Sequence, residues 1–172
     1  MSRIFILSAV IVLLSLAGSA FAEIGTMDNP IPIGQAVNLS KGWQLKVLSV
    51  VPNANNIIRN EPNADNIIRN ENGVNSPPKD GYQFFLARLE IKNIGSDVAQ
   101  FNDFDLNAVG ASLIAYGHEI GRTIPDPILT NDVFPGGVLT GNTLWEIKSS
   151  DASSLVKYHK NVKPYIFFSL TQ

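Results

Sequence analysis

The strongest constraint on the fold is an alternation of side chains at residues 81–95, GYQFFLARLEIKNIG. Every second residue from Phe85 to Ile91 is apolar, and the residues between them are charged from Arg88 onward. A period of two residues is typical of a β-strand with one buried and one solvated face. The first half of the run is apolar on both faces, which predicts that this strand begins in the interior of the domain.

Shorter runs of the same kind predict further strands, at residues 43–51, 98–106, 138–147 and 165–170. Segments rich in Gly, Pro, Asn and Asp separate these runs, and no window has the apolar spacing of a substantial helix. We therefore expect a single all-β domain that folds as an antiparallel β-sandwich. A closed barrel is the structural alternative.

Two of these runs make specific predictions about side chains. The run at 138–147 places Leu139, Thr143, Trp145 and Ile147 on one face of its strand. The run at 98–106 alternates Phe104 and Leu106 with aspartates. That alternation predicts a short, half-buried strand.

The N-terminus has the pattern of a secretory signal peptide. One positive charge, Arg3, precedes an apolar run, and small residues end the segment as Ala20-Phe21-Ala22. This arrangement predicts cleavage after Ala22, which leaves residues 23–172 as the mature domain. An uncleaved membrane anchor is the alternative, because the run is just long enough to span a bilayer. We expect removal, no remaining membrane span, and an extracellular or periplasmic location.

Composition excludes several classes of function. The chain has no cysteine, so it has no lipidated thiol, no disulfide, no thiol catalysis and no cysteine metal site. Its core alone must hold it together, and removal of 22 from 172 residues leaves 150, which is enough for one core. A formal net charge of −2 is too mild to indicate binding to nucleic acid.

Four phrases, in this order, resemble a known family. They are NPIPIG from Asn29, GWQLKVLSV from Gly42, PPKDGYQFFLARLEIKNIG from Pro77 and IPDPILTNDVFPGGVLTGNTLWEIKSSDASSLV from Ile124. The family is that of secreted telokin-like, immunoglobulin-like domains of unknown function, a group related to the mycobacterial immunoprotective extracellular protein. The resemblance covers essentially the whole mature chain. It implies an immunoglobulin-like sandwich in an exported prokaryotic protein, without an established enzymatic role or cofactor.

The resemblance also implies one departure. Many relatives carry cysteines at the positions that are Gly121 and Leu144 here. If these cysteines form a disulfide in the relatives, packing replaces it in this chain. We therefore expect a looser connection at the IPDP phrase, residues 124–127.

Catalytic residues are not indicated. The chain has two histidines, His118 and His159, and both lie among polar residues that are typical of surface loops. No G-x-S-x-G motif is present. We expect no catalytic residues and no cofactor.

A calcium site is the best metal candidate, and it is incomplete. Asp103, Asp105 and Asn107 match the opening D-x-D-x-N of a calcium-binding loop, but the glycine and glutamate positions of that loop hold Ala108 and Ile114. These residues remain weak candidates for an irregular surface site.

The Pro-rich connection at residues 124–137 supports two interpretations. Its prolines stiffen the chain enough for a structural crossover between two sheets, which is the interpretation we favour. Ile128, Val133 or Phe134, if exposed on a rigid loop, would instead form a recognition patch.

The most unusual feature of the chain is a ten-residue unit that occurs twice. The first copy, 52–61, is PNANNIIRNE, and the second copy, 62–71, is PNADNIIRNE. An even period of ten residues keeps the two Ile-Ile pairs in register if both copies are strands. On a helix, the same period would place the two pairs on different faces. We expect a surface loop, either an extended flap or a polar disordered segment. Its apolar residues Ile57, Ile58, Ile67 and Ile68 make it a candidate interaction loop.

These observations predict a secreted, non-enzymatic binding or interaction module of the extracellular space or cell envelope. Its partner would be an extracellular or cell-surface protein or ligand. Two alternatives remain: a secreted hydrolase or hydrolase accessory domain, and a structural cell-envelope protein.

The export signal makes a direct prediction. The protein recovered from the culture medium or periplasm of an expressing bacterium should begin at Glu23. Mass spectrometry of the intact exported protein checks this. A mass that includes residues 1–22 would contradict cleavage.

Overall fold

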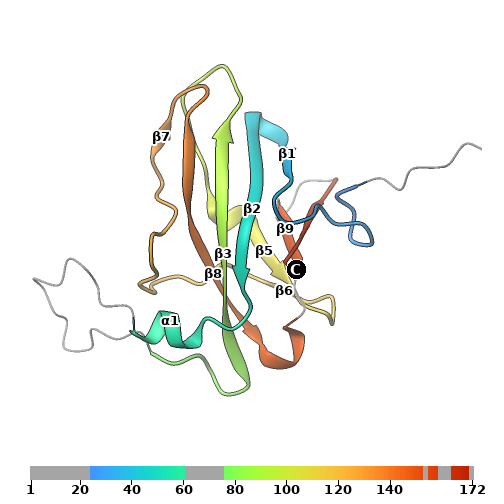
Figure 1. Cartoon of the computed structure of the whole chain (residues 1–172), viewed down its shortest axis with the longest axis vertical. Coiled ribbons are helices and arrows are strands. Elements are labelled where there is room, and N and C mark those ends of the chain that lie inside the picture. Colours follow the sequence, from blue (N-terminus) through green and yellow to red (C-terminus); the bar gives the residue numbers. More distant parts are fainter. Residues whose placement is uncertain (1–23, 61–75, 153–154, 159–163, 171–172) are drawn as a thin grey trace, which may run out of the picture.

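The computed structural model describes residues 24–60, 76–152, 155–158 and 164–170, and they form a β-sandwich (Figure 1). The first sheet has the strand order β1 (Ala36–Asn38), β2 (Trp43–Val51), β3 (Tyr82–Asn93) and β8 (Val138–Lys148). The second sheet has the order β10 (Ile166–Ser169), β9 (Leu155–Tyr158), β5 (Leu106–Val109) and β6 (Ala115–Tyr116). The described strand pairs are antiparallel, which confirms the predicted fold class.

The remaining elements are short. β4 (Ala99–Gln100) and β7 (Asp132–Val133) form a two-stranded ladder. In the described part of the chain, one α-helix, α1, covers Asn55–Asn60, and three 3₁₀ turns cover Ser40–Gly42, Asp103–Asp105 and Ser149–Asp151. Within the described ranges, no helix has the length and apolar character needed to cross a bilayer.

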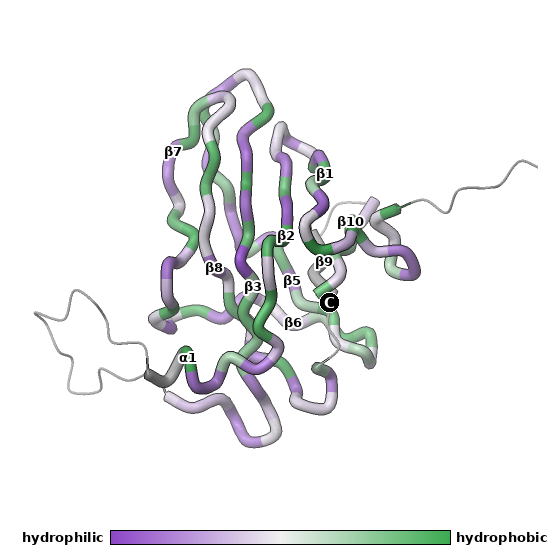
Figure 2. The backbone as a smooth tube through the Cα atoms, in the orientation of Figure 1, coloured by the Kyte–Doolittle hydropathy of each residue, from purple (hydrophilic) through white to green (hydrophobic). Residues whose placement is uncertain are grey.

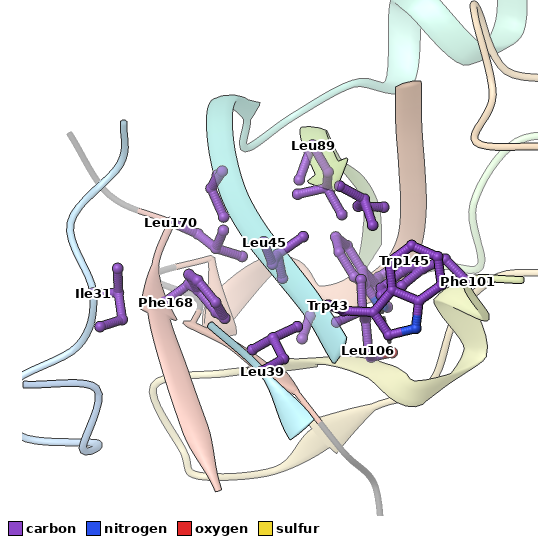
Figure 3. Packing of buried hydrophobic residues seen from close by; sticks show 14 of the residues in the cluster. Ile31, Leu39, Trp43, Leu45, Leu89, Phe101, Leu106, Trp145, Phe168 and Leu170 are labelled. Atoms are coloured by element: carbon purple, nitrogen blue, oxygen red, sulfur yellow. Dashed lines mark hydrogen bonds between the residues drawn. The ribbon is translucent and has the colours of Figure 1, made fainter. Parts of the chain in front are cut away.

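β3 is the central strand of the first sheet, and its alternation has the predicted consequence. Residues Phe85, Ala87, Leu89 and Ile91 are fully buried between the sheets. β8 pairs with β3 along its length and contributes Trp145 to the same core, as its own alternation predicts. The main core is shown in Figure 3, and its largest fully buried side chains include Trp145, Phe85, Phe101, Phe168, Leu45 and Leu106.

Trp145 joins the two sheets. Its side chain is fully buried, and its indole N–H donates to the backbone carbonyl of Leu106 in the second sheet at 3.3 Å. Its ring lies 6.3 Å from that of Phe85 on the neighbouring strand. A buried indole that finds a backbone acceptor adds a direction to packing that is otherwise non-directional.

The outer face of the first sheet is divided into two halves. Near the start of β3, Phe84 and Leu86 are buried with Leu144 and Ala54 in a second apolar cluster. The lower end of β2, which approaches α1, is also hydrophobic (Figure 2). Farther along, the outer face is solvated and carries ion pairs such as Lys46 with Glu90. The prediction that β3 begins in the interior and ends with one wet face is therefore confirmed.

The predicted strand at 98–106 is wrong over most of its length. Only Ala99–Gln100 forms a strand before β5 begins at Leu106, and Asp103–Asp105 forms a 3₁₀ turn. The side chain of Asn102 accepts a hydrogen bond from the backbone N–H of Phe104, which starts the turn and leaves Phe104 exposed. Local capping by Asn overrode the alternation of apolar and acidic residues.

Both lateral edges of the sandwich are closed by segments that pass from one sheet to the other. On one side, Ile31 bridges Phe168 of β10, and the chain then enters β1 on the first sheet. On the other side, β6 pairs with β5, and His118 then bridges Trp145 of β8. These segments form hydrogen bonds with backbone groups at the sheet edges. Unpaired edge groups could instead pair with a strand of another chain.

A buried carboxylate holds the β5–β6 turn. Asp151, which is 4% exposed, accepts hydrogen bonds from the backbone N–H of Ser112 at 2.7 Å and from its hydroxyl at 2.5 Å. It also accepts one from the Tyr116 hydroxyl at 2.7 Å. Gly110 lies directly under the carboxylate, so that a Cβ there would overlap it. We call this arrangement the Asp151 lock.

The lock shifts the pKa values of its members. The hydroxyls of Ser112 and Tyr116 hold the pKa of Asp151 below its ordinary value of 3.8, and burial opposes them without prevailing. Burial, followed by the hydrogen bond to Asp151, raises the pKa of Tyr116 above 10.0. A depressed carboxyl pKa stabilises the fold above the unfolded pKa and loses this effect as the pH falls through the folded pKa. A phenol with a raised pKa, such as Tyr116, stabilises the fold below its unfolded pKa, and this stabilisation is lost as the pH rises through the folded pKa.

Gly110→Ala should therefore destabilise the protein, because the new methyl group displaces the Asp151 carboxylate. We expect a loss of about 1–3 kcal/mol at neutral pH, the usual cost of overpacking, which is roughly 3–10 °C in Tm for a domain of this size. The difference from wild type should narrow below about pH 4, where the wild-type lock also weakens.

Gly117→Ala is the matched control, because a Cβ at Gly117 meets no atom within 4 Å. Thermal melts of both variants from pH 3 to pH 8 make the comparison. Equal Tm values for the two variants at neutral pH would contradict the role of the lock.

Candidate functional site

The first copy of the repeat is attached to the start of β3 by its leading residues. The backbone N–H of Ala54 donates to the carbonyl of Phe84 at 2.8 Å, and the N–H of Phe84 donates to the side-chain oxygen of Asn55 at 2.8 Å. The side-chain amide of Gln83 donates to the carbonyl of Pro52 at 2.6 Å. Ala54 itself is fully buried in the second apolar cluster. We call these contacts the β3 anchor.

The anchor satisfies a local need of the sheet. β2 ends its pairing with β3 at Val51, opposite Leu86, so the earlier residues of β3 lack a strand on that side. Residues 52–55 supply hydrogen-bond partners for the backbone N–H and carbonyl of Phe84, and Ala54 adds an apolar methyl group. A buried backbone group without a partner is costly, which explains why the chain follows β3 past the end of β2.

The predicted extended flap is wrong for the first copy. Residues Asn55–Asn60 form α1, and the side chain of Asn53 accepts a hydrogen bond from the N–H of Asn55 just before it. Ile57 is exposed on this helix, and Ile58 lies beside it in the sequence of the same helix. Ile67 and Ile68 lie outside the described residues, so the interaction loop remains a prediction.

Where the chain returns to the described part of the structure, Arg122 holds it. Its guanidinium donates to the carbonyl of Ser76 at 3.0 Å and lies 5.2 Å from the ring centre of Phe84. It also pairs with Glu119 at 3.2 Å. The two ends of the repeat-bearing connection are therefore fastened at the same place, around Phe84.

The Pro-rich connection is hydrogen-bonded to the edge of β8. Asn142 of β8 donates its backbone N–H to the carbonyl of Asp126 at 2.8 Å and its side-chain amide to the carbonyl of Pro125 at 2.6 Å. The N–H of Ile128 donates back to Asn142 at 3.0 Å. Next to it, Gly141 allows the backbone of the connection to approach β8 so closely that a Cβ would overlap Ile128. These contacts support the structural interpretation of this segment.

The IPDP phrase is attached without a disulfide, and its expected looseness stays a prediction. A side chain at Gly121 would meet no atom within 4 Å, whereas a disulfide brings two Cβ atoms to about 3.8 Å. Leu144 instead packs in the second apolar cluster, against which Ile124 also packs. Apolar contacts and the Asn142 hydrogen bonds tie this phrase to β8 without a covalent link.

His118 is not the surface residue that its sequence context predicts. Its side chain is 14% exposed, and its Nε2 lies 2.9 Å from a carboxylate oxygen of Asp103. Its ring packs edge-on against Phe104 with centroids 5.0 Å apart. The other ring nitrogen, Nδ1, is buried without a hydrogen-bond partner. A general base needs a ring nitrogen that can reach substrate, whereas Nε2 here contacts Asp103 and Nδ1 is buried.

The predicted calcium ligands have different surroundings. Asp103 is bound to His118 and also lies 3.5 Å from the hydroxyl of Thr143. Asp105 ends the 3₁₀ turn, and Asn107 is a buried residue of β5. In the described parts of the chain, no group of three or more His, Asp or Glu side chains could hold a metal ion.

Two loops lie at the end of the sheet opposite α1 (Figure 1), and both carry exposed apolar side chains. The loops are residues 94–98 and 134–138, and they carry Ile94, Val98, Phe134 and Val138. Phe134 is 68% exposed and Val138 is 52% exposed. We call these four side chains the apolar end. Sequence patterns missed it as a unit, because its two halves lie about forty residues apart in sequence and meet only in the fold.

A single buried side chain ties the two loops together. Asn93, at the end of β3, donates its side-chain amide to the carbonyls of Asp97 at 2.8 Å and Val133 at 2.7 Å. Its side-chain oxygen accepts from the N–H of Gly95 at 2.9 Å. Its backbone exchanges hydrogen bonds with residues 136 and 137. The apolar end is therefore presented on a connected framework.

Comparisons with known proteins give the fold. No family model matches the chain, and no curated protein matches its sequence. Among solved structures, it is similar to the secreted protein MPT63 of Mycobacterium tuberculosis, with a TM-score of 0.57 and 16% identity over 81% of this chain and 97% of that one. It is also similar to the yjhA protein of Bacillus subtilis, with a TM-score of 0.51 and 13% identity over 82% and 99% of the two chains. A conserved hypothetical protein of Bacillus anthracis has a TM-score of 0.50 and 16% identity over 81% and 95%.

These identities are low, so the comparisons show a shared β-sandwich fold and nothing about activity. The likeness to a secreted mycobacterial protein agrees, at the level of fold, with the resemblance that the sequence phrases suggest.

The surroundings of Asp103 predict the outcome of a calcium titration. Because Asp103 is bound to His118 and Asn107 is buried, we expect no change in Tm at millimolar calcium. Thermal melts with calcium and with a chelator check this. A rise in Tm that disappears in Asp103→Asn would contradict the prediction.

Proposed function

We propose that this protein is a secreted, non-enzymatic interaction module of the telokin-like, immunoglobulin-like kind. The signal-peptide pattern of residues 1–22 and the sandwich shared with a secreted mycobacterial protein support export to the extracellular space or envelope. Its partner is an extracellular or cell-surface molecule.

The apolar end is the observation that carries this proposal. Four exposed large apolar side chains stand on two loops that Asn93 joins at one end of a cysteine-free domain. Exposed apolar side chains that occur singly are ordinary, but a group of them on a connected framework marks a surface that another molecule covers. An aromatic anchor such as Phe134 is the residue type that dominates binding energy at such surfaces.

The surroundings of His118 weigh against the hydrolase alternative. A hydrolytic site needs a base that is open to substrate beside a nucleophile. His118 uses one nitrogen on Asp103 and buries the other. The pair instead lies beside β8, since His118 bridges Trp145 and Asp103 lies near Thr143, and a structural role is sufficient there.

The repeat region is a second candidate contact surface. Ile57 is exposed on α1, at the opposite end of β3 from the apolar end. Because the two surfaces lie at opposite ends of the sheet, substitutions can test each one separately.

A capture experiment tests the proposal. Purified wild type, Phe134→Ser/Val138→Ser and the control Ile114→Ser/Ile120→Ser are compared for binding to the cell envelope of the source organism. The control removes apolar side chains that are similarly exposed, 49% and 71%, in another part of the surface. We expect the first double variant to lose at least about tenfold in affinity, as hot-spot truncations do, while the control binds like wild type.

Two results would contradict the proposal in different ways. Undiminished binding by Phe134→Ser/Val138→Ser would remove the apolar end as the contact surface. If none of the three proteins shows saturable binding, the proposal that the protein is an interaction module would be contradicted. Equal Tm values ensure that lost binding does not arise from unfolding.

A further inference from the structure

The β3 anchor has two possible occupants in the same chain. We propose that Pro62–Asp65, from the second copy, docks on β3 in place of Pro52–Asn55, so that the repeat-bearing connection has two alternative registers. This inference goes beyond the proposed function and does not depend on the identity of a partner.

The anchor uses few groups, and most are independent of side-chain identity. Two of its three hydrogen bonds use backbone atoms of the first copy, the carbonyl of Pro52 and the N–H of Ala54. The remaining hydrogen bond uses one side-chain oxygen, that of Asn55, as an acceptor. The apolar part of the anchor is the methyl group of Ala54.

The second copy offers each of these groups at the same spacing. Pro62 and Ala64 repeat the backbone groups and the methyl group. The only difference between the copies is Asp65 in place of Asn55, and a carboxylate accepts a backbone N–H as an amide oxygen does. Both copies continue with the same residues, NIIRNE, so the segment that forms most of α1 is also present twice.

Exchange leaves the sheet unchanged. The pairing of β2 with β3 ends at Val51, immediately before the anchor, so one ten-residue unit can lie either after the anchor or between Val51 and Pro62. A repeated sequence makes such a register shift cheap, because the second copy offers β3 the same hydrogen-bonding groups and the same methyl group as the first.

Two effects favour the first copy, which is the one docked in the structure. Docking of the second copy closes an additional loop of residues 52–61, and loop closure costs entropy. It also brings the carboxylate of Asp65 to a half-buried position, where a charge loses part of its hydration. The second register should therefore become dominant only when the first copy is blocked.

Substitutions in the full chain test the exchange. Ala54→Arg blocks the first copy, because Ala54 is fully buried, and Ala64→Arg places the same side chain in the second copy. The reporter is hydrogen exchange of the Phe84 amide, which donates to the anchor. Tm is measured alongside.

We expect Ala64→Arg alone to change neither quantity. Ala54→Arg alone should keep the Phe84 amide within about threefold of its wild-type protection, because the second copy takes over the anchor. The double variant should lose at least about tenfold in protection and lower Tm by more than twice the loss in Ala54→Arg, a non-additivity that two independent sites would not give.

Loss of protection in Ala54→Arg alone, equal to that in the double variant, would overturn the exchange. If the double variant does not fold, the same comparison is made with Asn55→Ala, Asp65→Ala and their combination, which remove only the acceptor oxygen. Equal loss in Asn55→Ala and in that combination would overturn the exchange in the same way.

Discussion

The structure depends on the need to cover both faces of β3 near its start. Phe84 and Phe85 are adjacent and fully buried, so they point to opposite sides of the same sheet. The second sheet covers Phe85, and other parts of the chain must cover Phe84 and Leu86. The β3 anchor and the connection through Ile124 do so, and both therefore pack on the outer face of the first sheet.

This requirement explains the position of the repeat. The chain leaves β2, follows β3 to satisfy its backbone and apolar surface, and departs only after Asn55 has accepted the N–H of Phe84. Arg122 fastens the return at Ser76. A long insertion at such a point costs the fold little, because loop-closure entropy grows slowly with length. The other end of β3 is organised by Asn93, which holds two apolar loops that the core does not need.

Local patterns predicted well where one physical effect acts alone. The alternation in β2, β3 and β8 predicted the strands and their buried faces, because burial on one side imposes a period of two. They failed where a local hydrogen bond competed with that period. Asn102 starts a 3₁₀ turn at Asp103–Asp105, and Asn53 precedes a helix where an extended flap was expected. The prediction that His118 lies on the surface was wrong for another reason. Its neighbours in the fold, Trp145 and Asp103, are distant in sequence.

The sequence by itself determined the class of fold, the strands that form the core and the expected export route. Periodicity and the N-terminal pattern are properties of short segments, and the absence of cysteine is a property of composition. Only the tertiary structure decided which polar residues are engaged, that the Pro-rich segment clamps β8 through Asn142, and that loops 94–98 and 134–138 form one apolar end. The physical reason is that hydrogen-bond partners and shared surfaces arise between residues far apart in the chain, and no local period records which of them will meet.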